Sequence, residues 1–505
     1  ARINLSNRSV TTINTSDYEE WVGGHGMGSA IFYDIMVKEK GLSLEEIDGF
    51  NPECILTLLT SPVSGTIVPA APGRTELQGI GVQSSPIGWF TRSNFGGRFS
   101  TNLKYAGWDG IVIEGQALQP VWIDMRDNDI QIRNCSEISL WGTDAWESQQ
   151  MIWDYVADYQ GFGDWYQPTK NSNFTTQRPA VLAIARAGEN KCRTACLMHD
   201  AGNGAGQGGF GGIFGGKNLK AVSVIGTGCI EIDDPNGLIE ARLHQKENFE
   251  FDQYNLKNAG SGIAHESAPS AAAGRSGQRP QACVGCHSGC RHRFDDGFTN
   301  ESQCVETMLD AAGDRTTEIP DLVNRYGINT YEIYRGAPYL RDLYKLGVLG
   351  PGKEIDSLDL DFEDYASAEF YERLYQIMSE REGDFGDAIA EGFYRAAQRW
   401  GRLEEDIAAE ILPFSYWGLP EHGYDARAEL EWGYGSILGE RDINEHCFNA
   451  LYWDPTYAAL LGTEPKVTAE EAAKIYTDQM VPYEGDPLML DFSTENMYSE
   501  HICKL

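Results

Sequence analysis

The chain has 505 residues, and its 75 acidic and 40 basic side chains give a formal net charge of −35 at pH 7. A surface this acidic repels phosphate backbones, which argues against a nucleic-acid partner. The sequence holds no apolar run of about eighteen residues, so it predicts no membrane-spanning helix. The eleven cysteines are not spaced as a secreted disulfide framework, and they suit a reducing cytoplasm.

The first 225 residues are predicted to be β-rich, with glycine-dense loops between short strands. The N-terminus has no initiator Met and no signal-peptide pattern, so we expect a few leading residues to be missing. A helix is expected after Ser43, because Ser43-x-x-Glu46 forms a capping box. The predicted strands are 1–5, 110–115, 180–184 and 219–225, with a hairpin over 121–133.

From about residue 232 the pattern becomes helical. Asp234 and Pro235 form an N-cap and first-position pair, which predicts that a helix begins there. One amphipathic helix is expected over 387–397, and another after the capping box at Thr468. The sequence ends two residues after Cys503, abruptly for a folded domain.

Three cysteines, Cys283, Cys286 and Cys290, are spaced C-x2-C-x3-C. A zinc site normally joins a C-x2-C pair to a second pair of Cys or His, whereas a third nearby cysteine with a distant fourth favours an iron–sulfur cluster. Cys503 is the predicted fourth ligand. Zinc, or no metal, remains an alternative at this point.

Two glycine-dense stretches, 93–99 and 202–212, are each consistent with a cofactor loop or with a plain turn. Glycines let backbone N–H groups approach an anionic cofactor closely. Arg74 is a candidate for a bidentate phosphate contact, and a surface arginine is the alternative. Gly23–Gly28 fails the G-x-G-x-x-G pattern because Ser29 stands where the third glycine belongs, so a Rossmann site is rejected.

These motifs follow a fixed order along nearly the whole chain: 23–28, 61–65, 94–99, 105–110, 187–190, 202–222, 283–290 and 324–330. In this order they resemble the aldehyde ferredoxin oxidoreductase family of tungsten enzymes. The resemblance implies an α+β fold, with a β-rich pterin-binding domain (1–226) and two mainly helical domains (227–415, carrying the cysteines, and 416–505, incomplete). The family continues for roughly a hundred further residues, which fits the abrupt end.

The resemblance also implies a tungsten ion held by two pterins, one 4Fe–4S cluster and a magnesium ion bridging the pterin phosphates. Electrons from an aldehyde would pass through the cluster to ferredoxin or an iron–sulfur subunit, in a cytoplasmic oligomer. Glu306 and His446 fall where the family keeps its catalytic Glu and His. The cofactor residues carried over are Arg74, Asn94, Gly96, Asn203, Gly204, Asn324, Ile328 and Asn329.

The chain departs from the family at Asn203, where Arg is usual, at Asn329, where Asp is usual, and in the motif before Cys503. Cys304 lies two residues before Glu306, and an aryl-CoA-reducing branch of the family has a nearby cysteine that binds tungsten. A thiolate is a soft ligand that suits such a metal. A reductive aryl-CoA enzyme, or another non-aldehyde tungsten enzyme of the same family, is therefore the alternative to an aldehyde oxidoreductase. A non-enzyme rival is an electron-transfer or scaffold subunit that keeps only the cluster, and two intact cofactor loops argue against it. A buried free cysteine is the other interpretation of Cys304.

Overall fold

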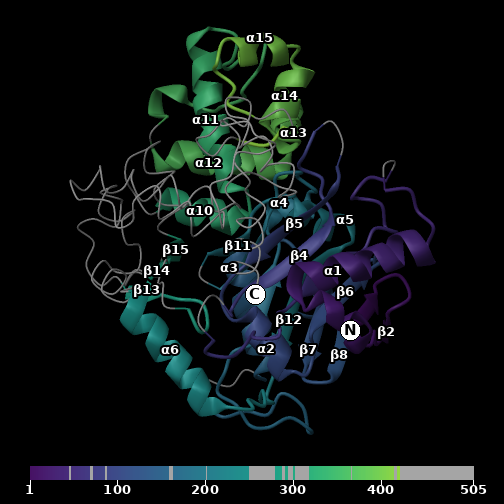
Figure 1. Ribbon diagram of the computed structural model, residues 1–505. Helices are drawn as coiled ribbons and strands as arrows, with labels where there is room; N and C mark the ends of the chain where they lie inside the picture. The colour runs from purple at the N-terminus through teal and green to yellow at the C-terminus, as the bar shows by residue number, and fades with distance from the viewer. Residues whose placement is uncertain are drawn as a thin grey trace, which may run out of the picture.

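The structure is a computed structural model of residues 1–505 (Figure 1). It describes residues 1–44, 47–68, 72–85, 88–158, 163–200, 202–249, 279–286, 291–293, 299–301, 318–365, 367–414 and 418–420. The α+β class is confirmed, because two mixed sheets form the N-terminal half and helices dominate the later described segments.

The first sheet has the strand order β2-β1-β6-β3-β4-β5. Its central strands β3, β4 and β6 are buried along their whole length, as expected of short apolar runs between turns. Strand β5 lies at one edge and pairs antiparallel with β4, so that Glu76 lies opposite Asn94. The bounds are β1 Arg2–Asn4, β2 Ser9–Thr11, β3 Leu56–Leu59, β4 Thr75–Ile80, β5 Phe90–Phe95 and β6 Gly110–Glu114.

The second sheet has the order β11-β10-β9-β12-β7-β8. Strands β7 and β8 form the predicted hairpin, and Asp127 in its turn has φ +53°. Strand β11 lies at the edge and is in contact with β5 of the first sheet, which joins the two sheets. The bounds are β7 Val121–Arg126, β8 Asp129–Asn134, β9 Ala180–Ala183, β10 Leu197–His199, β11 Asn203–Ala205 and β12 Leu219–Ile225.

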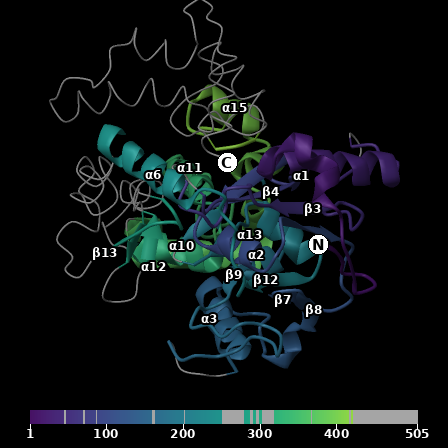
Figure 2. The ribbon, with the colours of Figure 1, turned by 60° about the horizontal axis from the view of Figure 1, so that its bottom comes forward.

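The two sheets share one apolar core, to which Leu77 and Ile111 contribute from the first sheet and Leu182 and Val222 from the second. Helix α1 covers the other face of the first sheet, and α3 covers the other face of the second, so the strands lie between them (Figure 2). The helices and short turns here are η1 Thr15–Trp21, α1 Gly24–Tyr33, η2 Asp34–Glu39, α2 Phe99–Tyr105, η3 Cys135–Glu137, α3 Ala145–Val156, α4 Arg186–Glu189 and α5 Phe210–Gly216.

Two buried lysines of the motif at 215–222 support this double-sheet core. Lys217 Nζ donates to the carbonyls of Pro52, Cys54 and Gly115, and burial lowers its pKa to about 8. Lys220 Nζ lies 2.6 Å from Glu189 Oε1, a carboxylate that also accepts from the N–H of Gly142. Both lysines therefore have a structural role.

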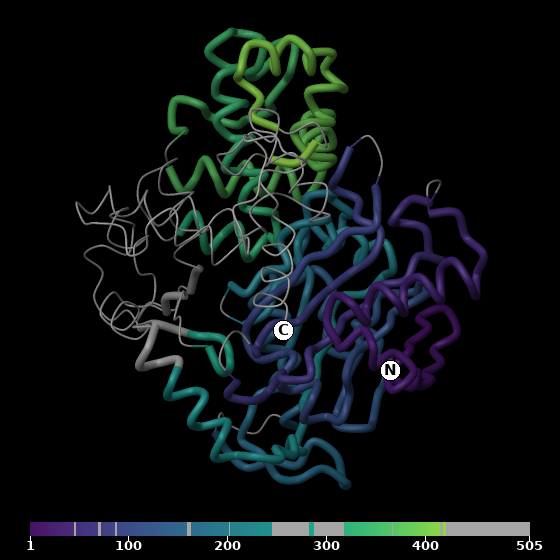
Figure 3. The backbone as a smooth tube through the Cα atoms, viewed as in Figure 1, coloured from purple at the N-terminus to yellow at the C-terminus, as the bar shows by residue number. Residues whose placement is uncertain are grey.

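The later segments begin with α6 and a small antiparallel sheet, β13-β14-β15, which the sequence did not predict. Helices α10–α15 then pack on a second core that includes Ala187, Cys192 and Ala195 from the N-terminal region, beside which they lie in Figure 3. The bounds are α6 Pro235–Phe249, β13 Arg279–Gln281, β14 Arg291–Arg293, β15 Thr299–Glu301, α10 Glu318–Tyr326, α11 Thr330–Lys345, η5 Phe362–Asp364, α12 Ala368–Glu380, α13 Gly383–Ala390, α14 Phe393–Arg399 and α15 Leu403–Ala408.

Two local predictions are wrong. The expected helix after Ser43 does not form in the described residues around it, and the helix of this region is α1, which begins within the rejected glycine motif. The single helix expected over 387–397 is two helices, α13 and α14, because Gly392 has φ +98° and interrupts it. The helix start at Asp234 and Pro235 is confirmed, and Asp234 accepts from the N–H of Gly237 at 2.9 Å. The helix expected after Thr468 lies outside the described residues.

Helices of the described residues are all too short or too polar to span a membrane.

Candidate active site

The first glycine loop joins β5 to α2. Arg74 lies just before β4, and because β4 and β5 are antiparallel it lies beside the end of β5, where its guanidinium donates to the side-chain oxygen of Asn94. Arg74 is therefore half-buried in the loop rather than a free surface arginine. Gly97 adopts φ +95°, which only glycine tolerates easily.

The second glycine loop lies against the first. Strand β11, at its start, pairs with β10 so that Asn203 lies opposite His199 and Gly204 opposite Met198. A Cβ placed on Gly96 would lie 2.9 Å from Oδ1 of Asn203, and one on Gly97 would lie 2.7 Å from Nε2 of His199. About a hundred residues separate the two loops in sequence, yet the backbone of the first packs directly against the side chains of Asn203 and His199.

His199 fixes this contact. Its Nδ1 lies 2.7 Å from the carbonyl oxygen of Val181, and its Nε2 lies 3.2 Å from both the backbone nitrogen of Arg98 and Oδ2 of Asp200. The Arg98 side chain also pairs with Asp200, with Nε and Oδ2 2.9 Å apart. The buried imidazole therefore holds the first loop onto the strand that leads into the second.

The cysteine segment lies on the same junction. Cys283 is buried and Cys286 is half-buried, and the N–H of Cys286 donates to the carbonyl of Cys283 across a turn in which Gly285 has φ +73°. The N–H of Val284 donates to the carbonyl of Gly97 at 3.0 Å, and a Cβ on Gly96 would collide with the sulfur of Cys283. One predicted cluster ligand, Cys283, thus lies beside the first glycine loop, and a second, Cys286, follows it across the turn.

The remaining predicted ligands and catalytic residues are not placed. Cys290, Cys503, Cys304, Glu306 and His446 lie outside the described residues. Within the part of the chain that the structure describes, no group of three or more metal-binding side chains forms, so the full ligand set stays a prediction.

The segment 324–329 lies next to the second glycine loop. Asn324 is buried in α10, Ile328 pairs with Ala195, and the N–H of Asn329 donates to the carbonyl of Thr194. The side chain of Asn329 caps α11 by accepting from the N–H of Tyr331 at 2.9 Å. Asparagine caps a helix about as well as the aspartate that is usual in the family.

Sequence reasoning missed two buried side chains here, Gln83 and Glu332. Oε1 of Gln83 accepts from the N–H of Gly208 at 3.1 Å and from Nδ2 of Asn329 at 3.4 Å, while its Nε2 donates to Glu332 at 3.1 Å. Burial raises the pKa of Glu332 to about 7. The sequence offered no signal for either residue, because a Glu in the first turn of a helix is usually solvated.

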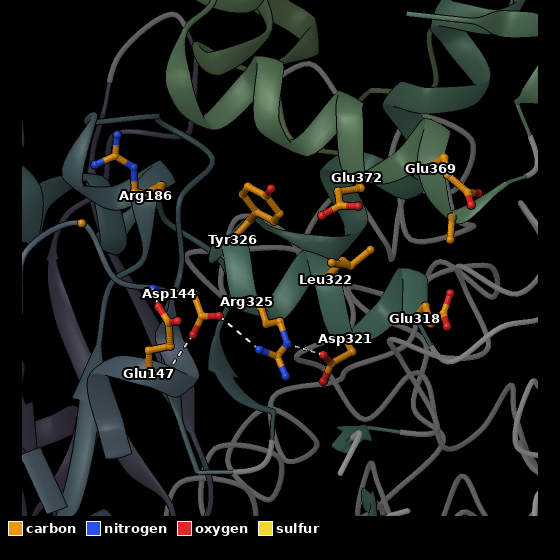
Figure 4. A pocket seen from close by; sticks show the side chains of 12 residues that line it. Asp144, Glu147, Arg186, Glu318, Asp321, Leu322, Arg325, Tyr326, Glu369 and Glu372 are labelled. Carbon is orange, nitrogen blue, oxygen red and sulfur yellow. Dashed lines mark hydrogen bonds and ion pairs between the residues drawn. The ribbon is translucent and has the colours of Figure 1, made fainter. Parts of the chain in front are cut away.

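A separate cavity of about 600 Å³ lies where α3 and α4 meet α10 and α12. Figure 4 shows Arg325 between Asp144 and Asp321, at 3.1 Å and 2.5 Å. The pair with Asp144 joins the N-terminal region to the later helices, whereas the pair with Asp321 lies within α10. The described residues lining this cavity belong to neither glycine loop, so it is not part of the candidate site.

Comparison with known families shows to which family the chain belongs. The N-terminal domain of aldehyde ferredoxin oxidoreductase matches residues 1–226, and domains 2 and 3 match residues 223–481. The chain belongs to the aldehyde ferredoxin oxidoreductase family. It is accordingly an oxidoreductase, as the sequence predicted.

Relatives within the aldehyde ferredoxin oxidoreductase family are distant. A tungsten-containing aldehyde ferredoxin oxidoreductase from Pyrococcus horikoshii is 27% identical over 84% of this chain and 71% of its own length. An aliphatic sulfonate oxidoreductase, WOR-like subunit, from Pyrococcus furiosus is 26% identical over 85% of this chain and 71% of its own. Family membership is therefore secure, while the substrate differs among relatives of similar distance.

A solved structure shares the fold. The active site complex BamBC of benzoyl coenzyme A reductase, in complex with 1,5-dienoyl-CoA, superposes with a TM-score of 0.63 at 22% identity. The match covers 82% of this chain and 66% of that chain, so this chain spans just under two thirds of the solved one.

The described residues fit the cofactors implied by the aldehyde ferredoxin oxidoreductase family. Gly96 and Gly97 give the loop a surface of bare backbone, which packs against Cys283, Asn203 and His199. Bare backbone of this kind can also approach an anionic phosphate closely. Arg74 supplies a guanidinium at that surface, and the thiol of Cys283, a soft ligand suited to iron, lies beside it.

Proposed function

We propose that this protein is a tungsten-dependent enzyme that oxidises an aldehyde with water to a carboxylic acid, releasing two protons and two electrons. The electrons leave one at a time through a 4Fe–4S cluster to ferredoxin or to a partner iron–sulfur subunit. The observation that carries the proposal is the meeting of the two glycine loops with Cys283, because it provides one place for pterin and cluster.

Each loop would hold one pterin. Arg74, Asn94 and Gly96 would contact the first, and Asn203 and Gly204 the second, with Asn324, Ile328 and Asn329 closing one pterin from the helical side. Main-chain carbonyls of Asn94 and Gly204 would face a magnesium ion that bridges the phosphates. When bound, the tungsten centre would accept the electron pair from the substrate.

The protein's own part in the reaction is binding and proton transfer. Glu306 would activate the attacking water or polarise the carbonyl, and His446 would move the proton or hydrogen-bond the carbonyl oxygen. Cys283, Cys286, Cys290 and Cys503 would hold the cluster as the electron exit.

Anaerobic purification followed by elemental analysis tests this proposal. We expect stoichiometric tungsten, about four iron atoms per chain as a 4Fe–4S cluster requires, and aldehyde-dependent reduction of a redox dye. Stoichiometric zinc with iron near zero would rule out the cluster, and tungsten without aldehyde oxidation would rule out the substrate class.

A second candidate function, reduction of an aryl-CoA thioester, is favoured by Cys304 beside Glu306 in the sequence. A thiolate bound to tungsten would occupy the position that water needs in aldehyde oxidation. The variant Cys304→Ala distinguishes the two functions. If the protein oxidises aldehydes, aldehyde-dependent dye reduction should survive the change. If it reduces aryl-CoA, the change should remove a tungsten–sulfur bond from the X-ray absorption spectrum.

A further inference from the structure

A buried polar network connects the second glycine loop to the helical region, and the proposed function uses only one member, Asn329. Its side chains are Gln83, Asn329 and Glu332, each at most 2% exposed. Gln83 lies between β4 and β5, and Glu332 lies in the first turn of α11. The network therefore joins Asn329 and Glu332 to Gly208 of the second glycine loop through Gln83.

The donors and acceptors of this network permit one orientation of the Gln83 amide. Its Oε1 faces two donors, the N–H of Gly208 and Nδ2 of Asn329, so a flipped amide would set its own donors against both. Its Nε2 needs an acceptor, which Oε2 of Glu332 provides. The other oxygen of Glu332 accepts from the N–H of Phe393 at 2.8 Å. Because both oxygens of Glu332 accept from donors, these hydrogen bonds favour its ionised form.

The surroundings leave the Gln83 side chain as the adjustable part. Arg395 from α14 donates to the carbonyls of Gln83 and Ser84, and Arg193 donates to the carbonyl of Val82. These contacts fix the backbone. Arg395 also favours the charge on Glu332, while burial, the larger effect, opposes it and raises the pKa of Glu332 to about 7. Beyond the arginines lie Glu391 and Asp48, both paired to Arg193.

We propose that Glu332 is a positioning residue whose ionised carboxylate holds Gln83 in the orientation that accepts from Gly208, and that a proton on Glu332 releases the second glycine loop. A protonated Glu332 Oε2 carries an O–H that must donate, and it faces Nε2 of Gln83, which is itself a donor. Turning the Gln83 amide would offer Oε1 as the acceptor instead. If the amide turns to accept it, the N–H of Gly208 loses its acceptor.

That this loop holds a cofactor rests on the proposed function, whereas the link between Glu332 and Gly208 does not. If correct, the affinity or position of the cofactor changes with pH near neutrality, through a residue that touches neither cofactor nor substrate. Gln83 is the only described side chain that transmits the change to Gly208.

Hydrogen–deuterium exchange of the holoenzyme tests the link, read in the peptide that covers residues 202–212 and corrected for intrinsic exchange rates. Loss of one buried hydrogen bond predicts that protection at Gly208 falls about tenfold between pH 8 and pH 6 in the unaltered protein. Glu332→Gln should show the low protection at both pH values, because an amide cannot accept from both Gln83 and Phe393. Asp342→Asn, on the same helix and away from Gln83, should behave as the unaltered protein.

Protection that does not change with pH in the unaltered protein, or that Glu332→Gln leaves high at pH 8, would overturn the proposal. If Glu332→Gln fails to fold, Gln83→Met decides instead: it removes the acceptor and should give low protection at both pH values, and unchanged protection would refute the link. Tungsten and pterin are measured in the same samples. Absence of the metal would refute the proposed function, whereas the exchange data would still test the link between Glu332 and Gly208.

Discussion

At the scale of single residues, Cys286 is a predicted cluster ligand, and Cys135 is a core cysteine that serves as its control. Cys286 is half-buried in the turn after Cys283, whereas Cys135 is buried in the core beneath α3, where burial raises the pKa of its thiol to about 12. We expect Cys286→Ser to lose the iron and the visible absorption of the cluster and to lower dye reduction at least tenfold, since ligand and electron exit are lost together. Cys135→Ser should keep both, with a modest loss of stability. Equal iron content in the two variants would contradict the ligand assignment.

Glu332 gives a stability prediction whose sign follows from its pKa. Its folded-state pKa is about 7 against an ordinary 4.5, mainly because burial disfavours the charge. The folded protein thus keeps a proton that the unfolded chain releases, so stability falls as pH rises from about 4.5 to about 7. We expect Glu332→Gln to raise the free energy of unfolding at pH 8 by roughly 1–3 kcal/mol, and to change it little at pH 5.

Chemical denaturation at the two pH values measures this effect, with Asp342→Asn as the variant that should show no such pH dependence. If Glu332→Gln changed the free energy of unfolding by the same amount at pH 5 and pH 8, the effect would not come from the buried charge on Glu332. The combination of greater global stability with lower protection at Gly208 would mark Glu332 as a residue that positions rather than one that stabilises.

At the scale of elements, Gly392 decides where one helix becomes two. Its φ of +98° and ψ of +149° lie in a region that is nearly specific to glycine, and a Cβ there would lie 3.2 Å from Oε1 of Glu332. We expect Gly392→Ala to destabilise the protein by about 1–3 kcal/mol. Gly401→Ala is the matched control, because Gly401 also has positive φ but faces open space, so it should cost about 1 kcal/mol or less. Equal unfolding midpoints would refute this account of the break.

The same elements show how far sequence reasoning reaches. Strands such as 219–225 and the hairpin at 121–134 follow from local pattern and turn residues, and the structure has them. The break at Gly392 could not be predicted from the sequence, because the apolar spacing on both sides suits one continuous helix. The contact between Gly392 and Glu332, which accompanies the break, is visible only in the structure. The contacts of Gly96 with Asn203 and Cys283 could not be derived from spacing, since spacing within each loop contains nothing about contacts across a hundred residues. The family resemblance alone assigned residues of both loops and the cysteines to one cofactor centre.

At the scale of the whole molecule, the arginines at the candidate site contrast with the acidic surface around it. Arg74, beside the first glycine loop, donates to Asn94, and Arg98, within the loop, pairs with Asp200, while the chain as a whole carries a formal charge of −35. Local positive groups would bind an anionic cofactor at short range, and the net charge governs what approaches from a distance. Under the proposed function, an electron acceptor would therefore approach through a field of opposite sign to the one that would hold the cofactor.

This contrast predicts opposite salt effects for two artificial electron acceptors, a dicationic viologen and a sulfonated anionic quinone. The Debye length is about 30 Å at 0.01 M salt and about 8 Å at 0.15 M, so steering by the net charge is strong at the first and weak at the second. We expect kcat/KM for the viologen to fall with added salt by a factor of several, up to roughly ten, and that for the quinone to rise. Steady-state dye reduction at saturating aldehyde measures both, and kcat serves as the control because it does not depend on approach. If the quinone were also slowed by salt, the electron exit would lie in a positive local field, and an acidic carrier would dock there despite the net charge.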